Sequence, residues 1–74
     1  MNKKIREQKI KIWKDNLAKL EEELRVIAEK KGAAAQEGDL SENAAYNIAT
    51  EDAETTRVRI EEVKKLIRDL EGGK

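Results

Sequence analysis

The sequence predicts an all-α fold, a two-helix antiparallel coiled-coil hairpin with its turn at residues 38–41. Three observations predict it. Apolar residues recur at alternating steps of three and four in two separate stretches, and the second stretch mirrors the first. The chain contains no proline, which would break a long helix. Charged residues make up 43% of the chain and aromatic residues only 3%, a composition typical of long helices rather than of a globular core.

The first helix is expected at about residues 4–36. Its apolar residues follow steps of 3, 4, 3, 4 and 3, as they do on the a/d face of a coiled coil. These residues are Ile10, Trp13, Leu17, Leu20, Leu24 and Ile27. The pattern weakens at Lys31 and Ala34, and Gly32 costs a helix about 1 kcal/mol relative to alanine. Glu37-Gly38 should end this helix, because glycine suits the left-handed C′ position.

The second helix is expected at about residues 40–71. Asp39 is predicted as its N-cap and Glu42 as its N3 residue, which is the capping-box arrangement with aspartate in the capping position. The apolar seam then follows the same alternating steps through Tyr46, Ala49, Ala53, Thr56, Ile60, Val63, Ile67 and Leu70. Gly72-Gly73 should end the helix.

The two seams pair in antiparallel order. Ile10 faces Leu70 at one end and Ala34 faces Tyr46 at the other, and the numbers of every such pair sum to 80. The centre of that register is residue 40, which places the turn between Gly38 and Ser41. Arms of about 30 residues give a rod roughly 45 Å long, with large side chains at the open end and small ones near the turn. The tip should therefore be slender.

Length and composition bound what the chain can be. Seventy-four residues allow a single small domain. The absence of cysteine and histidine excludes disulfides and thiolate or imidazole metal sites. No apolar run is long enough to span a bilayer and the start lacks a signal-peptide pattern, so a cytoplasmic protein with no membrane partner is expected. Charge is uneven, since residues 1–20 carry +5 and residues 32–56 carry −6.

A few apolar residues lie off the seams. Ile5, Ile12 and Val26 share a seven-residue spacing, and Leu66 joins Ile5 and Ile12 near the open end. Single exposed apolar residues are normal. Their clustering at the open end also fits a docking surface for another domain or a second copy, so self-association through that end is a further expectation.

Two acids, Asp39 and Glu42, occupy the predicted turn. The structural explanation is that they cap the second helix, with Ser41 and Asn43 as ordinary turn residues and Tyr46 as the last seam residue. The functional explanation is a divalent cation. Mg²⁺ is held by one or two protein carboxylates and keeps its other positions for water or phosphate. Two carboxylates alone hold it weakly, but they could complete a site whose remaining ligands come from a partner.

The stretch Gly38-Asp39-Leu40-Ser41-Glu42-Asn43-Ala44-Ala45-Tyr46 closely resembles the tip motif of the bacterial Gre transcript-cleavage factors, the GreA/GreB family. That motif reads approximately G-D-L-S/K-E-N-A-E-Y, and eight of its nine positions match in this chain. The helical arms match the family in length and register as well, so the resemblance covers almost the whole chain.

The resemblance implies a mechanism. Gre factors insert their N-terminal coiled coil through the secondary channel of a backtracked bacterial RNA polymerase. Their tip acids help hold a second Mg²⁺ and position the water, and the polymerase then cuts the extruded RNA 3′ end. By position the in-trans catalytic pair and Mg²⁺ ligands of this chain are Asp39 and Glu42, with Ser41, Asn43 and Tyr46 as tip support. The Mg²⁺ is shared with the polymerase, so the chain alone is not expected to be an enzyme.

The chain departs from the family in two ways. Ala45 stands where the family usually has glutamate, which leaves the acid pair intact but makes the tip less acidic. The C-terminal FKBP-like domain of the family is absent from these 74 residues, which fits either an N-terminal fragment or a short stand-alone relative.

Two alternative functions remain open: a helical hairpin that serves only in assembly, and a polymerase-channel binder without cleavage activity.

Overall fold

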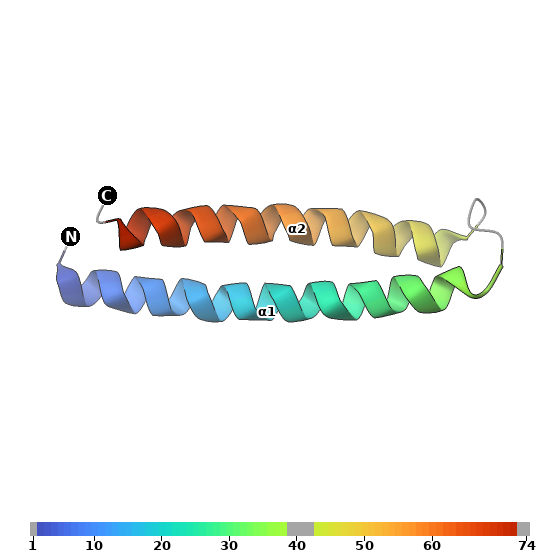
Figure 1. Ribbon diagram of the computed structural model, residues 1–74, viewed down its shortest axis with the longest axis horizontal. Coiled ribbons are helices and arrows are strands. Elements are labelled where there is room, and N and C mark those ends of the chain that lie inside the picture. Colours follow the sequence, from blue (N-terminus) through green and yellow to red (C-terminus); the bar gives the residue numbers. More distant parts are fainter. Residues whose placement is uncertain (1, 39–42, 73–74) are drawn as a thin grey trace.

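The chain forms a helical hairpin in a computed structural model that describes residues 2–38 and 43–72. Helix α1 spans Lys3–Ala35 and helix α2 spans Ala44–Glu71. The two helices lie side by side and antiparallel, so the start of α1 and the end of α2 are at the same end of the rod (Figure 1). The molecule measures 55 × 15 × 12 Å. The predicted all-α hairpin is confirmed, and its rod exceeds the expected length because the 33 residues of α1 alone span about 50 Å.

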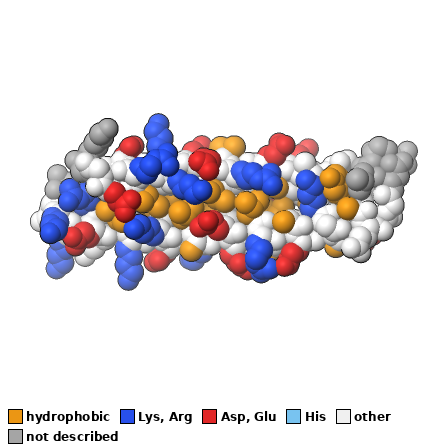
Figure 2. Space-filling model, viewed as in Figure 1, with side chains coloured by type: hydrophobic (Ala, Val, Ile, Leu, Met, Phe, Trp, Pro, Cys, Tyr) orange, Lys and Arg blue, Asp and Glu red, His pale blue; other side chains and the backbone are white. Residues whose placement is uncertain are grey.

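The core of the hairpin is the predicted pair of seams. Every buried residue in the described part of the chain lies on one seam or the other. These residues are Leu20, Ala34, Ala49, Ala53, Thr56, Ile60, Val63, Ile67 and Leu70. Figure 2 shows the apolar side chains as a row between the helices, with charged side chains along both edges. The apolar register therefore determines which faces of the two helices meet.

Large side chains concentrate in the half of the rod nearer the open end. Leu20, Ile60, Val63 and Ile67 form one cluster, and three partly buried side chains pack against it, namely Trp13, Leu17 and Leu24. Nearer the turn the buried residues are alanines. The large side chains of the cluster are about as well covered as the alanines, since Ile60 and Ala34 are both 6% exposed.

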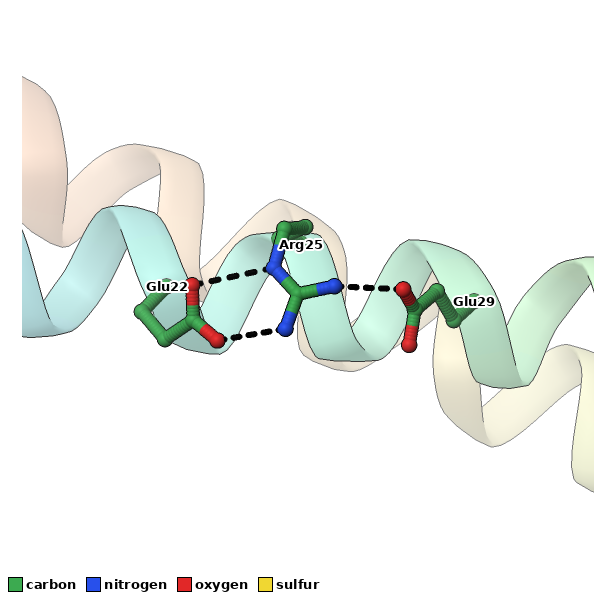
Figure 3. A network of polar contacts seen from close by, with 3 residues as sticks. All are labelled: Glu22, Arg25 and Glu29. Atoms are coloured by element: carbon green, nitrogen blue, oxygen red, sulfur yellow. Dashed lines mark hydrogen bonds and ion pairs between the residues drawn. The ribbon is translucent and has the colours of Figure 1, made fainter.

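The surface carries exposed ion pairs. Lys14 of α1 reaches Glu71 of α2 at 3.1 Å near the open end. On α1, Arg25 bridges Glu22 and Glu29, one turn to either side (Figure 3). The Arg25 Nε donates to Glu22 Oε2 at 2.9 Å, and this hydrogen bond lowers the pKa of the Glu22 carboxyl below its usual value. Such exposed pairs contribute little to stability.

Helix α1 passes through Gly32 and ends at Ala35, one residue before the expected end. Gln36 is the C-cap, and its backbone N–H donates to the Ala33 carbonyl, while the Glu37 N–H donates to the Ala34 carbonyl. Gly38 has φ +130°, a backbone conformation that side chains disfavour. The glycine requirement was predicted, although Gly38 lies two residues beyond the cap and not directly after it.

Helix α2 corrects the predicted boundary. It begins at Ala44, not near residue 40, because Asn43 is its N-cap. Asn43 has extended backbone angles (φ −94°, ψ 98°), and its side chain accepts a hydrogen bond from the Tyr46 N–H. The predictions of Asp39 as N-cap and Glu42 as N3 residue of this helix are therefore wrong. The other end agrees with the sequence, since α2 ends at Glu71 before Gly72.

Across the described residues, neither helix is long and apolar enough to cross a membrane.

Candidate functional site at the hairpin tip

The structure describes the two helix ends that flank the predicted tip site. Asp39, Ser41 and Glu42 belong to the connection between α1 and α2 and lie outside the described residues. Asn43 and Tyr46 are described, at the start of α2. The geometry that the structure describes is therefore that of the residues on either side of the connection, at the end of α1 and the start of α2.

Asn43 joins the two helix ends. Its Oδ1 accepts the Tyr46 N–H at 3.0 Å, and its Nδ2 donates to the Ala34 carbonyl at 2.7 Å. The first bond satisfies an N–H that the start of α2 leaves unpaired, and the second adds a donor to a carbonyl at the end of α1 that also accepts the Glu37 N–H. One partly buried side chain thus fixes where the chain leaves α1 relative to where it enters α2.

Tyr46 lies half-buried on the seam, in the first turn of α2. The Lys31 ammonium sits over its ring, 5.3 Å from the centroid, within cation–π range. The antiparallel pairing of the seams places Lys31 opposite Ala49. The Lys31 side chain reaches Tyr46 instead, so it extends toward the tip. Lys31 is a basic side chain beside the tip that the sequence reasoning did not single out.

Alanines keep this end of the rod thin. Ala34 and Ala49 are both buried between the helices, with 6% and 7% of their surface exposed. Their small side chains let the helices approach closely. The flanks of the site are thus two closely packed helix ends, joined by Asn43 and covered on one side by Tyr46 and Lys31.

The donors available for a metal are limited. Within residues 2–38 and 43–72, no cluster of three or more acidic, histidine or cysteine side chains could hold a metal ion. Asp39 and Glu42 are carboxylates, the hard oxygen donors that Mg²⁺ prefers. This donor set fits Mg²⁺ in type but not in number, so the remaining ligands would have to come from a partner or from water.

The chain matches the family model for the N-terminal part of transcription elongation factors, GreA and GreB, over residues 4–71. The chain belongs to this family. Among curated proteins, the transcription elongation factor GreA of Lachnoclostridium phytofermentans is 34% identical over 65 residues, which cover 77% of this chain and 41% of that relative. The chain therefore spans about two fifths of the length of the GreA relative. No solved structure matches it.

The family membership confirms the resemblance drawn from the tip motif. The sequence placed Asn43 and Tyr46 at the tip, and the structure gives each a contact that explains its position. It did not identify Lys31 or the Ala34 carbonyl. Both belong to seam positions, and the register already paired Ala34 with Tyr46, but the hydrogen bond to the Ala34 carbonyl and the stacking of Lys31 do not follow from apolar spacing.

Proposed function

We propose that this chain is the polymerase-inserting module of a Gre-type transcription elongation factor. It carries Asp39 and Glu42 into the secondary channel of a backtracked RNA polymerase and stimulates cleavage of the RNA 3′ end. The GreA/GreB family membership supports the transcriptional role. The rod supports the delivery, since a two-helix body with principal-axis extents of 55 × 15 × 12 Å is long and thin, as a narrow passage requires.

One observation carries the assignment of the acids. The structural alternative was that Asp39 and Glu42 serve as helix caps, but the cap of α2 is Asn43. Helix α2 therefore does not need Asp39 for its first turn. Two carboxylates that α2 does not need as caps, in the connection between helix ends that Asn43 joins, fit a role outside the hairpin.

The residues of this chain hold and present the acid pair. Asn43 ties both helix ends and so limits the relative movement of the two points from which the connection starts. The stacked Lys31 and Tyr46 stiffen one flank and place a positive charge near the tip. Asp39 and Glu42 would contribute oxygen ligands to a Mg²⁺ shared with the polymerase. When bound, that ion supplies an activated water or stabilises the leaving oxygen in phosphodiester cleavage. The catalytic centre is then that of the polymerase, and the chain alone is not an enzyme.

The test is RNA cleavage in purified backtracked bacterial elongation complexes. The wild-type chain is compared with the Asp39→Ala/Glu42→Ala double variant at equal concentration. Glu37→Ala is the matched control, because it removes an exposed acid next to the tip and leaves the pair intact. We expect faster 3′ cleavage with the wild type and the control, and none with the double variant.

The same assay separates the alternatives when binding to the polymerase is measured alongside. A chain that binds without accelerating cleavage is the channel binder without cleavage activity. A chain that neither binds nor accelerates is an assembly hairpin. Equal stimulation by the wild type and the double variant would contradict the role proposed for the acids.

A further inference from the structure

The hairpin has an apolar line of side chains that its own core does not use. Four apolar residues and one lysine on α1 are spaced seven apart, namely Ile5, Ile12, Lys19, Val26 and Ala33. Seven residues are nearly two helical turns, so these five side chains form one stripe that winds slowly around the helix. Ile12 is 63% exposed and Ile5 is 48% exposed, and Val26 is partly buried. We call this line the outer stripe.

The outer stripe shares a face with α2. Val26 and Lys30 are one helical turn apart and are therefore neighbours on α1. Lys30 lines a shallow cleft together with Ile48 of α2, which is 58% exposed. The opposite face is different in character. It carries the Lys14–Glu71 ion pair and a cleft rich in charge, lined in part by Glu21, Arg57 and Lys64.

We propose that the outer stripe is a homodimer surface on which a second copy of this chain lies antiparallel. The stripe is nearly symmetric about Lys19, with two apolar residues on each side. When two copies run in opposite directions, Ile12 lies opposite Val26 of the second copy and Ile5 opposite Ala33 of the second copy. The two Lys19 side chains then meet at the centre.

The charge distribution favours this direction over the parallel one. Among the described residues, the half of the rod at the open end (residues 2–20 and 60–72) has ten basic and six acidic side chains, a net charge of +4. The half at the tip (residues 21–38 and 43–59) has five basic and eight acidic side chains, a net charge of −3. An antiparallel pair brings opposite charges together along the whole rod, whereas a parallel pair brings like charges together.

The face is also large enough. A surface 55 Å long and 15 Å broad offers about 800 Å², which is roughly the area that each partner buries in a standard protein–protein interface. The proposal does not depend on the polymerase function, because it rests only on this face and on the charge of the two halves.

The first test is the dimer dissociation constant, measured by sedimentation equilibrium on the full chain. Ile12→Lys should raise it at least about tenfold, since a charge replaces an apolar contact made twice per dimer. Val58→Lys is the matched control, because Val58 is 58% exposed on α2 and lies away from the stripe. It should leave the dimer unchanged. Lys19→Leu should tighten the dimer by removing the like charges at its centre. Circular dichroism confirms that each variant is helical.

The second test fixes the direction. The chain has no cysteine, so Ile5→Cys and Ala33→Cys can be introduced singly and mixed under oxidising conditions. An antiparallel pair yields the mixed Ile5→Cys/Ala33→Cys disulfide, and a parallel pair yields the Ile5→Cys homodimer. A chain that stays monomeric at millimolar concentration overturns the proposal. The outer stripe would then be a surface that binds another domain or protein. Equal effects of Ile12→Lys and Val58→Lys, or a preference for the Ile5→Cys homodimer, overturn it as well.

Discussion

Replacing Asn43 by alanine should destabilise the whole hairpin, although the side chain lies at one end of it. The substitution removes an N-cap, which contributes about 1 kcal/mol. It also removes the Nδ2 donor to the Ala34 carbonyl, and the loss of a partly buried hydrogen bond costs about another 1 kcal/mol. The expected loss in the free energy of unfolding is therefore about 2 kcal/mol. For a domain of this size it corresponds to a fall in Tm of roughly 8–16 °C.

The measurement is urea and thermal unfolding followed by circular dichroism at 222 nm. Asn43→Asp separates the two bonds, because aspartate still accepts the Tyr46 N–H but cannot donate to Ala34. It should lose about half of the stability that Asn43→Ala loses. Asn16→Ala makes the same chemical change at an exposed position within α1 and should not destabilise, since alanine favours helix. If the free energy of unfolding of Asn43→Ala is within about 0.5 kcal/mol of the wild-type value, the hydrogen bonds of Asn43 do not hold the two helix ends together.

Three further predictions concern glycine and charge. Gly32→Ala should raise the free energy of unfolding by about 1 kcal/mol, because Gly32 is within α1 and an added Cβ meets nothing within 4 Å; no change in urea unfolding would refute this. Gly38→Ala should lower it by about 1–2 kcal/mol, because φ is +130° there although the space is open; a neutral result would show that the backbone relaxes without strain. Arg25→Ala should return the pKa of Glu22 to its ordinary value, which NMR titration of the carboxyl carbon measures. Because the folded-state pKa of Glu22 is lowered, any contribution of the pair is present above the unfolded pKa and is lost as pH falls through the folded value. A Glu22 pKa that is the same with and without Arg25 would show that the hydrogen bond from Arg25 does not cause the shift.

The sequence predicted the fold well because one physical pattern determines it. Seam residues on both arms, from Trp13 at the open end to Tyr46 at the tip, are buried or partly buried in the hairpin. Thr56 shows the strength of the pattern, since a polar residue is 6% exposed where the seam requires a core position. Burial of an apolar helix face is favourable only against a matching face. Because the second seam mirrors the first, only one antiparallel pairing of the two helices buries both.

The helix ends were predicted less well, because several residues can cap a helix. Asp39, Ser41 and Asn43 are all residue types that favour the N-cap, and the seam does not distinguish among them. Asn43 has an additional bond to the Ala34 carbonyl, which exists only once the hairpin has formed. The contact of Lys31 with Tyr46 joins the two helices in the same way and exists only once the hairpin has formed. Local sequence therefore identified the tip but not the side chains that hold it.

The proposed role of the tip acids is to bring a metal ion to the polymerase, and the Mg²⁺ dependence of RNA cleavage in backtracked complexes tests it without intermediate steps. The rate of 3′ cleavage is measured over three Mg²⁺ titrations. One contains the wild-type chain, one contains the Asp39→Ala variant, and one contains the backtracked complex with no added chain. We expect the wild type to lower the Mg²⁺ concentration needed for half-maximal cleavage and Asp39→Ala to restore the higher value. A half-maximal concentration that is the same in all three titrations would mean that the tip acids do not recruit the ion.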